Sequence, residues 1–274
     1  MNTVLATTDF STASRNAVNY AAELARSFKA KLVLFHAYSL PVMSETPVPV
    51  STLDELEKEY MKKMKRIVAG LHKLYGSKLT IEPVLRCGFA VDEICEYAGG
   101  RDISMIVAGM QGAGYFSEQL NGSVATALIS KASCPVLCVD RKVKFTKPKK
   151  IVLASDLKEI KNHTFADTLQ EFATHFKSEL QILNVFKPNE VMPTVSEAIE
   201  GMRLDQWLKG IKHSFQYIES DDAVDGINRF VKENMADMVV MIARNHTILE
   251  RLFKEPNTKK MAFHSVVPLL TVHN

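Results

Sequence analysis

Short apolar segments rich in β-branched residues alternate along the chain with amphipathic segments of helical period. In the first half the apolar segments predict strands at residues 3–8, 31–37, 79–86, 104–108 and 135–139. The segments between them predict helices at residues 14–28, 53–74, 90–98 and 122–131. Strands and helices that alternate in this order are typical of a parallel α/β sheet.

The second half repeats this order of elements. Its predicted strands are residues 151–155, 180–186, 214–219, 238–242 and 269–272, and its predicted helices are 164–176, 195–211, 223–234 and 249–263. The closing regions align without a gap at an offset of 133, since 134–139 matches 267–272, and the openings 4–9 and 151–156 also match. We therefore expect two copies of one domain, at residues 1–142 and 147–274. Each is predicted to be a doubly wound, Rossmann-like parallel sheet of five strands.

The segment that joins the two copies is polar and strongly basic. Residues 141–150 carry six lysine or arginine side chains and are interrupted by Pro148. This composition predicts a solvated linker, with a local surface for acidic partners as the alternative.

Composition and charge narrow the class of protein. The chain has 274 residues, of which 46% are hydrophobic and 24% charged, enough for two domains. Its net charge of +3 is close to balance, so we expect neither nucleic acid nor a membrane as a partner. The opening residues do not form a signal peptide, and no apolar run approaches the length of a membrane helix, so we expect a cytoplasmic protein. The four cysteines lack the spacing of a zinc site and are expected to be reduced thiols: Cys87, Cys95, Cys134 and Cys138.

A glycine pattern follows the fourth predicted strand. Gly109, Gly112, Gly122 and Ser123 form the spacing G-x2-G-x9-G-S, which leads into a helix. Glycines allow backbone to approach a ribose and phosphates closely, and a helix that opens with free N–H groups and a hydroxyl favours an anion. The pattern predicts a nucleotide phosphate site. A glycine-containing loop without a ligand is the alternative.

Two further residues have both a structural and a functional interpretation. Asp9 follows the first strand, where a carboxylate can contact a ligand or can cap a turn. Its recurrence as Asp156, in the half without the glycine pattern, favours the structural role. His36 ends the second strand and is either a core histidine or part of the same crevice.

The whole chain resembles a tandem universal stress protein, and residues 1–140 resemble one complete domain of that family. The resemblance rests on the opening segment Thr-Asp-Phe-Ser at 8–11, on Gly88, on the glycine pattern, and on the closing strand 134–139. It implies an adenine nucleotide alpha hydrolase-like fold and an adenine nucleotide, ATP or ADP or AMP, as the ligand. A Mg²⁺ ion that bridges the phosphates is a further expectation.

The resemblance also implies a role for individual residues. Asp9 lies by the nucleoside, the backbone of Ala37 borders the adenine, and Gly109 lies at the ribose, with the remaining positions around the phosphates. The full nucleotide-binding set is Thr7, Asp9, Ala37, Ala108, Gly109, Gly112, Gly122, Ser123 and Val124. Many relatives place a histidine or arginine where this chain has Gln111, which predicts weaker ATP binding.

The second half lacks the phosphate pattern. At the offset of 133 the three glycines and the serine become Ile242, Asn245, Glu255 and Pro256. A branched side chain blocks close approach and a carboxylate repels phosphates, so we expect a degenerate copy that binds no triphosphate and serves pairing or partner contacts. On its second helix Met202 and Trp207 suggest an apolar stripe for a partner.

These features predict a stress-response protein that binds an adenine nucleotide and signals or protects, with no catalytic residues and no protein-held metal. The alternatives are a stress protein that acts only through protein contacts, a slow ATPase, and a flavodoxin-like electron carrier. In single-domain relatives the last strand pairs with its mate in a dimer. We therefore expect residues 135–139 and 269–272 to pair within one chain as a pseudo-dimer, with a homodimer through other faces as a further possibility.

Overall fold

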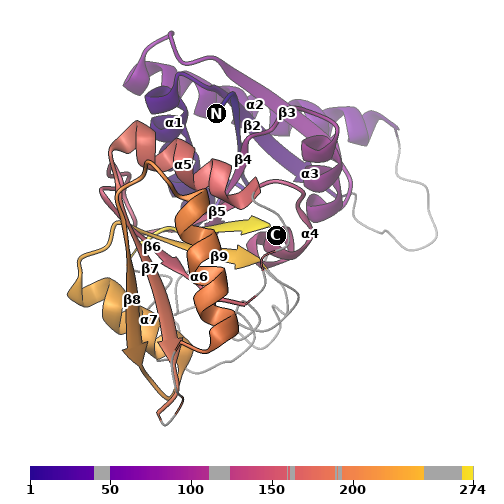
Figure 1. The fold of residues 1–274 in the computed structure, drawn as a ribbon. Helices are drawn as coiled ribbons and strands as arrows, with labels where there is room; N and C mark the ends of the chain where they lie inside the picture. The colour runs from indigo at the N-terminus through magenta and orange to yellow at the C-terminus, as the bar shows by residue number, and fades with distance from the viewer. Residues whose placement is uncertain are drawn as a thin grey trace, which may run out of the picture.

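One ten-stranded β-sheet runs through the molecule, with helices on both of its faces (Figure 1). The structure is a computed structural model. It describes residues 1–39, 50–110, 124–158, 160, 164–188, 190, 193–243 and 267–273.

The described residues of the first half form five strands and four helices, in the order that the sequence predicts. They are β1 (Thr3–Thr7), α1 (Thr12–Phe28), β2 (Lys31–Tyr38), α2 (Val50–Tyr75), β3 (Ile81–Cys87), α3 (Ala90–Gly99), β4 (Met105–Met110), α4 (Val124–Lys131) and β5 (Val136–Asp140). Helix α1 begins at a serine N-cap, where the Ser11 side chain accepts a hydrogen bond from the Ser14 backbone N–H. It ends at Lys29, which adopts the left-handed conformation.

The second half follows the same order. Its elements are β6 (Lys150–Ala154), α5 (Thr164–Phe176), β7 (Glu179–Phe186), α6 (Val195–Trp207), β8 (His213–Glu219), α7 (Ala223–Glu233), β9 (Met238–Ala243) and β10 (Leu269–His273). Helix α6 ends at Trp207 rather than at the predicted residue 211, because Gly210 turns the chain at a φ of +93°. The helix predicted at 249–263 lies outside the described residues.

The strand order shows how the two halves join. It runs β3-β2-β1-β4-β5-β10-β9-β6-β7-β8, so each half has the order 3-2-1-4-5 of a doubly wound sheet. Strand pairs within each half are parallel, and β5 pairs with β10 in antiparallel register, with Leu270 opposite Leu137. The two predicted five-stranded sheets are therefore the halves of one continuous sheet.

Helices α1 and α5 pack together on one face of the sheet (Figure 1). The Phe28 ring stacks on His175 with 3.9 Å between ring centroids and meets Phe176 edge to face at 5.3 Å. Ser27 and His175 are hydrogen bonded at 2.8 Å. One buried apolar cluster thus extends from the first half into the second, which couples the two halves by apolar burial.

The segment between the halves is exposed over most of its length, as the sequence predicts, but it is anchored on the core at a few positions. Val143 is buried, and Phe145 packs edge to face on Tyr20 of α1 at 5.0 Å. The Asn16 side chain donates hydrogen bonds to the carbonyls of Asp140 and Val143 at 2.8 and 2.7 Å. Its two apolar residues are what bring this otherwise basic segment onto the core.

Candidate functional site

The carboxyl ends of β1, β2 and β4 meet at one edge of the first half. Because the strands are parallel and adjacent, the register brings Thr7, Ala37, Ala108 and Gly109 to the same end of the sheet, with Asp9 in the turn that follows β1. Such an edge is where open α/β sheets place their ligands. Of the other predicted binding residues, Val124 begins α4 and is 39% exposed. Gly112, Gly122 and Ser123 lie outside the described residues.

Ala37 is the residue of β2 whose backbone faces this edge without a strand partner among the described residues. The last pair between β1 and β2 joins Thr7 to Phe35, and the Thr8 N–H donates to the Phe35 carbonyl at 2.9 Å. Alternate residues of a strand direct their N–H and C=O groups to the same side. Those of Ala37 therefore point toward the space beyond the end of β1. A planar ligand in that space would meet one donor and one acceptor from a single residue.

The turn after β1 is held by its own side chains. Asp9 Oδ1 accepts a hydrogen bond from the Ser11 N–H at 2.9 Å, and Thr8 Oγ1 accepts one from the Phe10 N–H at 3.1 Å. Phe10 adopts a φ of 66°, an uncommon conformation for a bulky residue. Burial by itself would raise the pKa of Asp9, but hydrogen bonds from Ser11 and Ser14 outweigh it and lower the pKa. Asp9 is thus an ionised, exposed carboxylate with a structural task, and its contact with a ligand stays a prediction.

The same turn recurs in the second half. The Leu157 N–H donates to Ser155 Oγ at 3.1 Å, the Lys158 N–H donates to Asp156 Oδ1 at 3.2 Å, and Leu157 has a φ of 49°. Because this half lacks the glycine pattern, the turn is a feature of the fold that does not depend on phosphate binding.

His36 is a core histidine that holds this turn. Its Nδ1 lies 2.7 Å from the Thr8 carbonyl, and its ring packs between Phe10 and Tyr60 at centroid distances of 4.4 and 4.8 Å. Burial lowers the pKa of His36, so the neutral imidazole donates through Nδ1–H, while the buried Nε2 has no hydrogen-bond partner. In the second half Asn184 takes the equivalent place and donates to the Ser155 carbonyl at 3.1 Å.

A glycine is needed at position 109 for a structural reason that the sequence did not reveal. A Cβ at this position would lie 2.7 Å from the carbonyl carbon of Ala13 and 2.8 Å from the Ser14 nitrogen, both in the first turn of α1. The glycine therefore allows α1 to approach β4, whatever it does for a ligand. The sequence contained no signal of this contact, because it predicted a helix that starts at residue 14, whereas α1 starts at Thr12, three residues after Asp9.

The second half accommodates a side chain at the equivalent position. Ile242 is half-buried and packs against the core. Helix α5 begins eight residues after Asp156, at Thr164, so its first turn does not need the space that α1 needs. Asn245, Glu255 and Pro256 lie outside the described residues.

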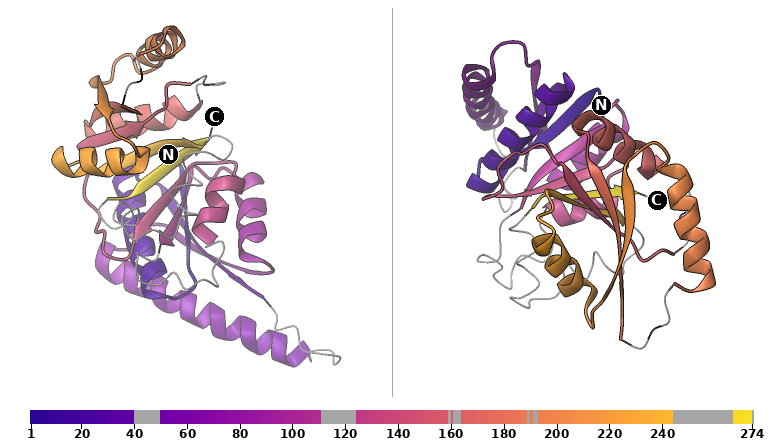
Figure 2. Two further views of the ribbon diagram at one scale, coloured as in Figure 1. Left: turned by 90° about the horizontal axis from the view of Figure 1, so that it is seen from below. Right: turned by 60° about the vertical axis from the view of Figure 1, so that its left-hand side comes forward.

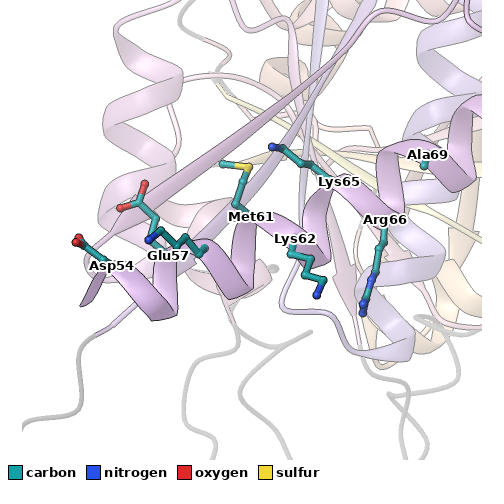
Figure 3. Close-up of a pocket in the computed structure, with 8 residues that line it drawn as sticks. Asp54, Glu57, Met61, Lys62, Lys65, Arg66 and Ala69 are labelled. Carbon is teal, nitrogen blue, oxygen red and sulfur yellow. The ribbon is translucent and has the colours of Figure 1, made fainter. Parts of the chain in front are cut away.

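Other parts of the described chain offer no competing chemistry. No group of three or more His, Cys, Asp or Glu side chains there is placed to hold a metal, and no helix there is long and apolar enough to cross a membrane. The cysteines are free thiols, and burial raises the pKa of Cys138 to about 12, which makes it unreactive. A hollow of about 760 Å³ lies along the exposed side of α2 and is lined by a row of its side chains, Asp54, Glu57, Lys58, Met61, Lys62, Lys65, Arg66 and Ala69 (Figure 3).

Comparison with known proteins agrees with this architecture. The universal stress protein family model matches residues 1–140 and again residues 147–273. The universal stress protein YxiE of Bacillus subtilis is 28% identical over 145 residues, which are 50% of this chain and 98% of that protein. The universal stress protein MJ0531 of Methanocaldococcus jannaschii is 30% identical over 136 residues, 49% of this chain and 79% of that protein.

A solved structure shares the fold over the full length. A universal stress protein from Archaeoglobus fulgidus superposes with a TM-score of 0.72 at 16% identity and covers 100% of this chain and 96% of its own. Two family matches therefore account for both halves of the ten-stranded sheet, and this chain belongs to the universal stress protein family.

Proposed function

We propose that the first half binds an adenine nucleotide at the carboxyl ends of β1, β2 and β4, and that the protein acts in the stress response as a binding module rather than as a catalyst. The observation that carries the proposal is the backbone of Ala37, whose N–H and C=O lie beyond the last β1 pair. An adenine edge carries the matching acceptor and donor. ATP, ADP and AMP are the candidate ligands, and Mg²⁺ would accompany the phosphates.

The surrounding residues suit the rest of such a ligand. The exposed carboxylate of Asp9 is held by the turn in a position to accept hydrogen bonds from ribose hydroxyls. Helix α4 begins at Val124, next in the chain after the glycine pattern, so its free N–H groups and dipole favour phosphates at that end.

A charge substitution at Val124 tests the phosphate part of the site. Val124→Glu adds a carboxylate to the first turn of α4, at a side chain that is 39% exposed. We expect ATP affinity to fall at least tenfold, equal to about 1.4 kcal/mol, and adenosine affinity to stay unchanged, because only the phosphates are repelled. In the Val124→Gln variant the new side chain has nearly the same shape as glutamate but no charge, so this variant should retain ATP binding. The measurement is calorimetric titration of nucleotide-free protein with ATP, AMP and adenosine.

A contact-only stress protein is the second candidate, because two features of the crevice have reasons other than a ligand. The turn at Asp9 recurs in the half without the glycine pattern, and Gly109 is required by α1. If neither the purified protein nor the nucleotide-free protein binds any of the three ligands, this second function replaces the first. Equal loss of ATP affinity in both Val124 variants would contradict the proposed phosphate position.

A further inference from the structure

The ten-stranded sheet has two outer edges that differ in their protection. Among the described strands, β3 and β8 each have a neighbour on one side only. The N–H of Gly88, directly after β3, bonds to the Tyr38 carbonyl, and the N–H of Ser220, directly after β8, bonds to the Phe186 carbonyl. In both strands the backbone N–H and C=O groups of even-numbered residues therefore point toward the neighbouring strand. Those of odd-numbered residues point away from the sheet, toward its open edge. An open edge of this kind is a template for another strand.

The β3 edge is blocked. Pro83 occupies an outward position and has no N–H to offer, which is how edge strands commonly avoid pairing. The helix that covers β3 also has a densely charged exposed side, with side chains of both signs, Asp54, Glu57, Lys58, Lys62, Lys65 and Arg66 (Figure 3). Charged side chains next to an edge disfavour pairing with another chain.

The β8 edge lacks both protections. Phe215 occupies the position in β8 that Pro83 occupies in β3, third from the start of the strand, and it keeps its outward N–H. The centre of β8 reads Ser-Phe-Gln-Tyr-Ile and contains no proline and no charge. Tyr217, the next outward residue, has a side chain that is 41% exposed.

The helix next to this edge exposes an apolar stripe. Val195, Ile199 and Met202 recur at helical spacing on α6 and are 81%, 53% and 73% exposed. The opposite side of α6 packs on the sheet, since a Cβ at Gly201 would lie 3.7 Å from the Phe215 ring. Figure 2 shows α6 at the periphery of the second half, with the sheet on one side of it only. Contiguous exposed apolar side chains of this kind mark interaction surfaces.

We propose that a second copy of this chain pairs with the β8 edge around a two-fold axis that passes midway between Gln216 and Gln216 of the second copy. Antiparallel pairing in this register places Phe215 opposite Tyr217 of the second copy, so the outward groups of these two residues form four hydrogen bonds across the axis. In such a pair, residues whose backbone groups face the open edge must lie opposite one another. Phe215 and Tyr217 are both residues of this kind. An aromatic pair directly opposite across two strands adds to the stability.

Charge selects the same arrangement. Lys209 and Lys212 lie at the amino end of β8 and Glu219 and Asp221 at its carboxyl end, all exposed, whereas His213 is bonded to Asp205 and Asp222 caps α7. An antiparallel pair brings the basic end of one copy to the acidic end of the other. Within the chain the Lys212 side chain also donates to Glu179, and the Arg229 side chain donates to the Glu219 carbonyl. Because that carbonyl is already bonded, the backbone pairing with the second copy rests on the central residues of β8.

The two-fold axis also determines where the two α6 helices lie. Odd-numbered residues of β8 share the face covered by α6, so opposing odd residues keep that face common to both copies. The two α6 helices then lie on one face of a continuous sheet. Their apolar stripes point away from that sheet, opposite the side at Gly201 that packs on it.

The test is the mass of the full chain in solution, by sedimentation equilibrium from low to high micromolar concentration. We expect a concentration-dependent dimer of twice the 30.7 kDa chain mass. The Phe215→Pro variant transfers the protection of β3 to β8 and should be monomeric, since it removes the outward N–H along with a ring that packs beside α6. A circular dichroism spectrum checks that it folds.

A second variant keeps the test independent of strand geometry. Lys209→Glu changes only an exposed side chain at the amino end of β8 and should weaken the dimer at least tenfold, because it places a carboxylate near Glu219 and Asp221 of the second copy, while Lys62→Glu on the exposed side of α2 should not change it. A chain that remains monomeric at high micromolar concentration overturns the proposal. So does a dimer that survives both the folded Phe215→Pro variant and the Lys209→Glu variant. Neither result bears on nucleotide binding, which is measured separately.

Discussion

Replacement of Gly109 by alanine separates the structural reason for this glycine from a functional one. The new Cβ would lie 2.7 Å from a backbone carbon of α1, whereas ordinary contacts begin at 3.4 Å. The atoms it meets are backbone, so relief requires β4 or α1 to shift. Overpacking of this kind costs about 1–3 kcal/mol, against a gain of about 0.4–1 kcal/mol from the less flexible unfolded chain. We expect a net loss of about 1–2 kcal/mol, and a Tm lower by roughly 2–8 °C.

The assay is urea and thermal unfolding of nucleotide-free protein, so that lost ligand binding cannot contribute. Gly70→Ala is the matched control, because Gly70 lies in α2 with no atom within 4 Å of the added Cβ. It should gain about 0.5–1 kcal/mol from helix propensity. If Gly109→Ala is as stable as the wild type without nucleotide, the close approach of α1 is not what this glycine serves.

Two further substitutions test how the two halves and the turn are held. Asn16→Ala removes both hydrogen bonds to the carbonyls of Asp140 and Val143 and should cost about 1–3 kcal/mol in urea unfolding; an unchanged midpoint would mean that these carbonyls find other partners. Burial lowers the pKa of His36 below its ordinary value of 6.5, so on acidification the unfolded chain takes up a proton at this residue before the folded chain does. The stability of the wild type should therefore fall as the pH drops below 6.5. Above that pH the stability should not depend on this residue's protonation. His36→Asn copies the arrangement of Asn184, keeps a donor for the turn, and should make that fall shallower; an equally steep fall in the variant would assign it to other groups.

Much of the architecture follows from the sequence alone. The alternation of apolar and amphipathic segments identified five strands in each half, and the internal repeat identified two copies of one domain, because local periodicity depends on which face of an element is buried. The family resemblance led us to expect the last strands of the two halves to pair, and in the structure β5 and β10 are antiparallel neighbours with Leu137 opposite Leu270.

Contacts between distant residues depended on the tertiary structure. The closeness of Ala13 to Gly109 is set by the angle at which α1 crosses β4, and no local pattern encodes such an angle. The packed position of Val143 depends on Asn16, which lies more than a hundred residues earlier in the chain.

The candidate site is divided in the same way. The sequence by itself determined which residues follow the ends of the strands, because strand ends are marked by turn residues such as Asp9. Only the tertiary structure decided that His36 faces the core, that the Ala37 backbone lies beyond its last β1 partner, and that Pro83 protects one edge of the sheet while Phe215 leaves the other open. Each of these depends on which strands lie side by side and in what register, and that is a property of the assembled sheet.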